Sequence, residues 1–152
     1  MYIPEEEYKI ILKKMPILCV DLLIVFGKKF LLLKRNNEPA KGEYWFPGGR
    51  LYKMETIKDA SIRKAKEEVN LSCNFKHIVS IEETIFEKTG AMFTDIHTVN
   101  IVCSLTTKSI AELKVDNLHD GYKWFSYSEI DELNLHVGIV NPLKIEFSRV
   151  KK

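Results

Sequence analysis

The stretch from Gly48 to Leu71, GGRLYKMETIKDASIRKAKEEVNL, constrains this chain more than any other part of it. A double glycine opens the stretch, and residues 56–70 follow with the spacing of a helix that has one apolar stripe. Glu67 and Glu68 stand near the end of that helix, where the helix dipole disfavours negative charge. Adjacent carboxylates at that place indicate a bound cation, and Mg²⁺ binds one or two carboxylates together with substrate phosphates.

A plainer interpretation of the same two glutamates is that both form ion pairs on the surface of the helix. Glu67 comes four residues after Arg63, and Glu68 comes four residues after Lys64. Such pairs stabilise a helix by about 0.2–0.5 kcal/mol each. The residue pattern of the helix is compatible with both a metal site and surface ion pairs.

The rest of the chain alternates between strand-like and helix-like segments. We expect one domain over residues 1–152, since this length supports a single apolar core. The mixture predicts an α/β sandwich with a mixed β-sheet. We expect a final helix that begins after Asn141 as N-cap, with Pro142 in its first position. The expected helices are 4–14, 56–70 and 128–133, the expected strands are 17–26, 29–34, 75–84, 95–106 and 122–126, and 36–49 and 112–121 are expected loops.

Composition excludes several classes of protein. Hydrophobic residues make up 45% of the chain and charged residues 29%, which is ordinary for a globular protein and not for a fibrous or disordered one. The net charge of +2 is too small to indicate nucleic-acid binding. The longest apolar run, 17–26, is interrupted by Asp21 and is too short to span a membrane. Three cysteines without a CxxC pair indicate reduced thiols, so we expect a cytoplasmic protein without a signal peptide.

The spacing within the Gly48–Leu71 stretch resembles the Nudix box, Gly-x5-Glu-x7-Arg-Glu-U-x-Glu-Glu-x-Gly-U, where U is apolar. The resemblance implies an α/β/α sandwich that hydrolyses a nucleoside diphosphate linked to another moiety, with Mg²⁺ or Mn²⁺ as cofactor. By position, Glu68 matches the principal metal-ligating glutamate, Glu67 the second one, and Gly48 the backbone ligand. Glu55 and Arg63 match a structural ion pair that ties the loop to the helix.

Two positions depart from that motif. Lys64 stands where the family has a glutamate, so the local charge differs by two units one turn before Glu68. This change is expected to lower the number of cations held, to one. Asn70 stands where the family has glycine, and asparagine tolerates the left-handed conformation that a helix end often needs.

Residues outside the box are similar to the GDP-mannose mannosyl hydrolases, a Nudix subfamily whose box is eroded in the same way. The subfamily cleaves the C1–O bond of the sugar, so water attacks carbon and not phosphorus. The matching positions are Pro16, Val20-Asp21, 31–42, Pro47 to Arg50, Thr94-Asp95 with His97, and His119-Asp120 with 122–124.

This closer resemblance implies roles for individual residues. Arg35 and Arg50 are assigned to the diphosphate, Asp21 and His97 to other substrate contacts, and His119 to the general base. An imidazole with a pKa near neutrality suits the base role. Leu118 stands where the compared enzyme has a metal-ligating glutamine, so we expect either a lower metal affinity or compensation by another group such as Glu67 or Asp120. The resemblance also implies a homodimer.

Three functions remain open on the sequence. The first is hydrolysis of a GDP-sugar at C1–O. The second is a pyrophosphatase that cleaves a P–O bond of another nucleoside diphosphate derivative. The third is a non-catalytic nucleotide-binding module, which Lys64 and Leu118 favour.

Overall fold

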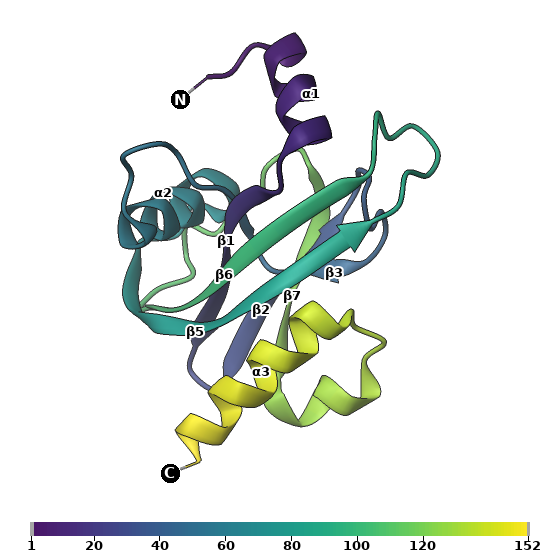
Figure 1. Ribbon diagram of the computed structural model, residues 1–152. Coiled ribbons are helices and arrows are strands. Elements are labelled where there is room, and N and C mark those ends of the chain that lie inside the picture. The colour runs from purple at the N-terminus through teal and green to yellow at the C-terminus, as the bar shows by residue number, and fades with distance from the viewer. Residues whose placement is uncertain (1, 152) are drawn as a thin grey trace.

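A computed structural model describes residues 2–151 of the chain. Within these residues, a seven-stranded mixed sheet lies between the helices α2 and α3, and α1 leads into the sheet from the N-terminal end (Figure 1). The elements are α1 (Glu5–Lys14), β1 (Ile17–Phe26), β2 (Lys29–Arg35), β3 (Tyr44–Trp45), β4 (Gly48–Arg50), α2 (Ile57–Val69), β5 (Cys73–Phe86), β6 (Ile96–Thr107), β7 (His119–Ser126), the 3₁₀ helix η1 (Tyr127–Glu132) and α3 (Val137–Val150). The predicted α/β sandwich with a mixed sheet is therefore confirmed.

The central strand β1 changes partners along its length. It runs parallel to β6 from Ile17 to Val25, and it pairs with β2 where the two strands meet in the hairpin at Gly27. Towards its beginning, β1 pairs with β4 instead, with Asp21 opposite Gly48. The loop that opens the Gly48–Leu71 stretch is thereby fixed against the middle of the sheet.

Apolar residues alternate between the two faces of β1 and β2 and fill two cores. One core packs under α2 and includes Val20, Leu22 and Ala65. The other packs under α3 and includes Leu23 and Leu143. Because side chains alternate along a strand, neighbours in the long apolar run 17–26 point to opposite cores.

Most predicted segments agree with the structure, and the strands β2, β5 and β7 are longer than expected. The loop 36–49 contains the short strands β3 and β4, and β7 begins at His119 inside the expected loop 112–121. Asn70 ends α2 in the left-handed conformation, with φ of 53°, as predicted. Cys73 and Cys103 are buried free thiols, and Cys19 is a half-buried one.

The prediction for the last helix is wrong. α3 starts at Val137, the side chain of His136 accepts the N-cap hydrogen bond from the Gly138 N–H, and Pro142 lies inside the helix. Proline in a helix interior costs about 3 kcal/mol. Burial of the stripe formed by Gly138, Ile139, Pro142, Leu143 and Glu146 outweighs that cost.

Among residues 2–151, the helices are all too short or too polar to cross a lipid bilayer.

Candidate functional site

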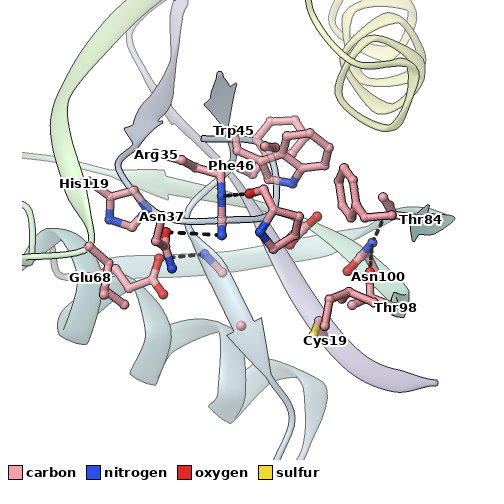
Figure 2. A pocket seen from close by; sticks show the side chains of 18 residues that line it. Cys19, Arg35, Asn37, Trp45, Phe46, Glu68, Thr84, Thr98, Asn100 and His119 are labelled. Carbon is pink, nitrogen blue, oxygen red and sulfur yellow. Dashed lines mark hydrogen bonds between the residues drawn. The ribbon is translucent and has the colours of Figure 1, made fainter. Parts of the chain in front are cut away.

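A cavity of about 230 Å³ opens where β1 leaves β2 and pairs with β4; we call it the central cavity. Figure 2 shows its lining, with Glu68 and His119 at one end and Thr84, Thr98 and Asn100 at the other. The lining residues are Cys19, Asp21, Arg35, Asn37, Pro39, Ala40, Trp45, Phe46, Gly48, Gly49, Glu68, Thr84, Phe86, Ile96, Thr98, Asn100, Leu118 and His119. Of the sequence-predicted site residues, the cavity thus brings together Asp21, Arg35, Gly48, Glu68 and His119.

Glu68 is buried at the end of α2, with 7% of its surface exposed. One carboxylate oxygen, Oε2, accepts a hydrogen bond from the Gly48 N–H at 2.9 Å. The other, Oε1, lies 2.8 Å from Nζ of Lys64. A buried carboxylate is costly unless it is paired, so these two contacts fix Glu68 toward the cavity.

Glu67 lies in a different environment from its neighbour. Its carboxylate contacts Arg63 Nη1 at 3.1 Å and Lys64 Nζ at 3.4 Å, and its side chain is 46% exposed. The ion pairs expected from the plainer interpretation are therefore both present. The pair at Glu68 is buried beside the cavity, whereas Glu67 lies at the surface and does not line the cavity.

His119 carries a carboxylate partner that the sequence analysis missed. Nδ1 of His119 lies 2.6 Å from Oδ1 of Asp116, and the imidazole side chain is 6% exposed. An ionised carboxylate only accepts hydrogen bonds, so Nδ1 carries the proton and Nε2 is the basic nitrogen. The spacing Asp-x-x-His was the signal in the sequence that could have identified Asp116.

Asp21 is buried in the floor of the central cavity, directly opposite Gly48 in the sheet. Burial first, and then the charge of Glu68, raise the pKa of its carboxyl to about 7, although a hydrogen bond from Trp45 opposes the shift. A buried carboxyl group is costly unless it has polar partners, and the polar lining of the central cavity provides them for Asp21.

Arg35 ends β2 and enters the cavity from the side opposite α2. Its Nε donates to the Pro39 carbonyl at 2.8 Å, and Nη2 donates to Oδ1 of Asn37 at 3.3 Å. Burial lowers the pKa of Arg35, and Glu68 and Asp21 oppose that shift. The loop 36–49 therefore holds a guanidinium in a fixed orientation within a site that is otherwise rich in carboxylates.

Two other sequence-predicted residues lie outside the central cavity. His97 sits on the opposite face of β6, where Nε2 lies 2.8 Å from Oε1 of Glu83. Arg50 lines a neighbouring cavity and stacks between the rings of Tyr8, at 5.2 Å, and Tyr52, at 5.3 Å. Side chains alternate between the two faces of a strand, and Ile96 and Thr98 point into the central cavity. His97 lies between them and therefore points to the other face of β6.

The acidic end of the cavity fits a divalent cation. Glu68, Asp116 and His119 each offer a ligand atom, and these atoms lie within 4.8 Å of one another. The two carboxylate oxygens are donors that Mg²⁺ or Mn²⁺ accepts, and the imidazole of His119 lies beside them. Asp116, and not Glu67 or Asp120, is the acid that the fold brings beside Glu68.

The far end of the cavity is polar but uncharged. The amide of Asn100, 5% exposed, donates to Oγ1 of Thr84 and to Oγ1 of Thr98, both at 3.0 Å (Figure 2). Trp45 and Phe86 lie close by, with ring centroids 5.8 Å apart. Hydroxyl and amide groups beside aromatic rings can bind the neutral part of a ligand by hydrogen bonds and stacking.

The ion pair expected between Glu55 and Arg63 is present. Arg63 Nε lies 2.6 Å from Oε1 of Glu55, Nη2 donates to Oε2 at 2.8 Å, and Nη2 also donates to the carbonyl of Arg50 at 3.1 Å. The fork joins α2 to the segment before it and keeps β4 beside the cavity.

Comparison with known proteins agrees with this geometry. The family model of the NUDIX domain matches residues 15–143. The low-salt glycan biosynthesis protein Agl8 of Haloferax volcanii is 31% identical over 123 residues, which cover 81% of this chain and 79% of that protein. An ADP-ribose pyrophosphatase of Methanocaldococcus jannaschii is 38% identical over 66 residues, 43% of this chain and 39% of that protein.

Solved structures show the same fold. The crystal structure of a MutT protein from Methanosarcina mazei Go1 superimposes with a TM-score of 0.71 and 26% identity, and the match covers 91% of this chain and 98% of that one. The family match spans the sheet, the α2 carboxylates and His119 together. This chain therefore belongs to the NUDIX domain family and is a Nudix hydrolase.

Proposed function

We propose that the chain hydrolyses a GDP-sugar of the GDP-mannose type at the C1–O bond of the sugar, giving GDP and the free sugar. The observation that carries the proposal is the meeting of three groups in one cavity: the His119 imidazole with Asp116 behind it, the Glu68 carboxylate and the Arg35 guanidinium. The same cavity continues to the neutral polar end at Asn100, which suits the uncharged part of the substrate.

In this mechanism His119 is the general base. Its Nε2 accepts a proton from water as the water oxygen forms a bond to C1. The bond from C1 to the diphosphate oxygen breaks, and its electron pair leaves with GDP. Attack on the face opposite GDP inverts the anomeric centre. Asp116 positions this base, since its carboxylate holds the tautomer and orientation of His119.

Negative charge develops on the diphosphate as it leaves, and positively charged side chains of this chain stabilise that charge. Arg35 is held by the Pro39 carbonyl with its guanidinium in the central cavity. Arg50 reaches the diphosphate from the neighbouring cavity. A divalent cation held by Glu68, Asp116 and the Gly48 backbone would neutralise further charge on the leaving group.

Hydrolysis in ¹⁸O-water tests the proposal on the bond itself. With GDP-mannose and Mg²⁺, we expect the label in the free sugar and none in the phosphate product. A panel of other nucleotide sugars, run under the same conditions, identifies the preferred base and sugar. Label in a phosphate product overturns the proposal.

A second candidate is cleavage of a P–O bond, which the likeness to the ADP-ribose pyrophosphatase over 66 residues favours. It predicts a nucleoside monophosphate among the products, with label in a phosphate. The Lys64–Glu68 ion pair argues against it, because an ammonium in that place leaves fewer carboxylates to gather metal ions for attack on phosphorus. A non-catalytic module predicts nucleotide binding without turnover of any member of the panel.

A further inference from the structure

We propose that the ammonium of Lys64 has two roles in the diphosphate site. It contacts the diphosphate of the substrate directly, and it limits the carboxylates of α2 to one divalent ion. The inference rests on the proposed function only in taking a nucleoside diphosphate as ligand. It does not depend on which bond is broken or on which sugar is bound.

The first observation is where the ammonium lies. Nζ of Lys64 is 2.8 Å from Oε1 of Glu68 and 3.4 Å from Oε2 of Glu67. It thus sits between the two carboxylates that the sequence analysis assigned to metal ions. A second divalent ion at the same two carboxylates would be repelled by the ammonium a few ångströms away.

The second observation is that the ammonium is partly withdrawn from water. The Lys64 side chain is 16% exposed, so bulk solvent neutralises its charge less than that of a surface lysine. Its two carboxylate partners, Glu68 and Glu67, stabilise the ammonium by their negative charge.

The third observation is a close approach at Gly49. A Cβ atom at Gly49 would lie 2.8 Å from Cε and 3.1 Å from Nζ of Lys64. Any larger residue would displace the lysine, so glycine is what lets the ammonium lie against the backbone. Gly49 lines the central cavity on its other side.

Lys64 also lines the neighbouring cavity, of about 500 Å³, which we call the outer cavity. Its lining residues are Tyr2, Ile3, Tyr8, Arg50, Tyr52, Arg63 and Lys64. Three of them are cationic, and Lys64 forms part of the wall between the outer cavity and Gly49. A diphosphate that runs from Arg35 to Arg50 across Gly49 therefore passes the ammonium of Lys64.

Binding of inorganic pyrophosphate in EDTA tests the direct contact without metal, base or sugar. We expect Lys64→Met to weaken binding by about tenfold, the usual worth of a charge-assisted hydrogen bond. Lys64→Arg keeps the charge and should retain binding. The matched control is Lys66→Met on the same helix, whose side chain is 54% exposed and which should bind as the native protein does. Equal affinity of Lys64→Met and native protein overturns the proposal.

Titration with Mn²⁺, followed by electron paramagnetic resonance, tests the limit on metal ions. We expect one Mn²⁺ per native chain and two per Lys64→Glu chain, because the substitution turns the ammonium into a further carboxylate. One ion in Lys64→Glu, or two in the native chain, overturns the proposal.

Loss of Lys64 leaves Glu68 buried without its partner, so Lys64→Met can fail to fold. The double variant Lys64→Met/Glu68→Gln removes both charges and keeps the experiment decisive. In EDTA it should bind pyrophosphate more weakly than Glu68→Gln alone, and equal affinities contradict the contact. A native enzyme that releases nucleoside monophosphate would overturn the proposed function while leaving both Lys64 measurements valid.

Discussion

Nδ1 of His119 lies 2.6 Å from Oδ1 of Asp116, and this pair closes the end of the central cavity where Glu68 enters from α2. The hydrogen bond selects the tautomer in which Nε2 is the basic nitrogen. Asp116 also accepts a hydrogen bond from the Leu118 N–H at 3.0 Å, so one side chain fixes both the backbone before His119 and its ring.

Replacement of His119 should remove the base and spare binding. We expect His119→Ala to lower kcat at least tenfold, because a general base usually accelerates a reaction by about 10²–10⁴-fold. KM for the nucleotide sugar should change less than kcat. Steady-state kinetics, with the melting temperature as a check on folding, measure this. A rate equal to that of the native enzyme would remove His119 from the mechanism.

Glu68 and Glu67 should differ in their effect on metal binding although they are adjacent. Glu68→Gln should abolish Mn²⁺ binding and metal-stimulated turnover, because the buried carboxylate faces Asp116 and His119. Glu67→Gln should cost much less, since its carboxylate is exposed and contacts Arg63 and Lys64. Mn²⁺ titration of the two variants compares them directly. Equal losses of Mn²⁺ binding in the two variants would show that Glu67 is also a metal ligand.

The fork between Arg63 and Glu55 should contribute to stability. We expect Arg63→Met to lower the free energy of unfolding by about 1.5–3 kcal/mol, the range for hydrogen bonds to charged groups. The substitution also removes the contact of the guanidinium with Tyr52 at 3.8 Å. Urea denaturation measures the change. Glu5→Gln, in an exposed ion pair of α1, is the control and should leave the midpoint unchanged.

Asp21 should make the metal-free protein less stable as pH rises. Its pKa is raised from 3.8 to about 7 in the folded state, so between these values the folded protein keeps a proton that the unfolded chain has released. The free energy of unfolding should therefore fall through this window, by about 2–4 kcal/mol, and level off above it. Denaturation in EDTA from pH 4 to pH 8 measures the slope.

Asp21→Asn is the matched variant for that experiment, because it keeps the shape of the side chain and cannot ionise. Its stability should depend less on pH over the same window, and it should exceed the native protein in stability near pH 8. An identical slope in the two proteins would show that Asp21 does not retain its proton on folding.

The helix that carries Glu67 and Glu68, the Glu55–Arg63 pair and the left-handed Asn70 could all be predicted from the amino-acid sequence alone. These features depend on local spacing and on helix periodicity, both of which can be read along the chain. Homodimerisation stays a prediction.

Which charged groups share a cavity became clear only from the folded chain. It placed Asp116 beside Glu68 and turned His97 to the opposite face of β6. It also began the last helix at Val137, five residues before Pro142. These outcomes depend on strand register and on burial between segments far apart in the chain, and both are set by packing that no local pattern contains.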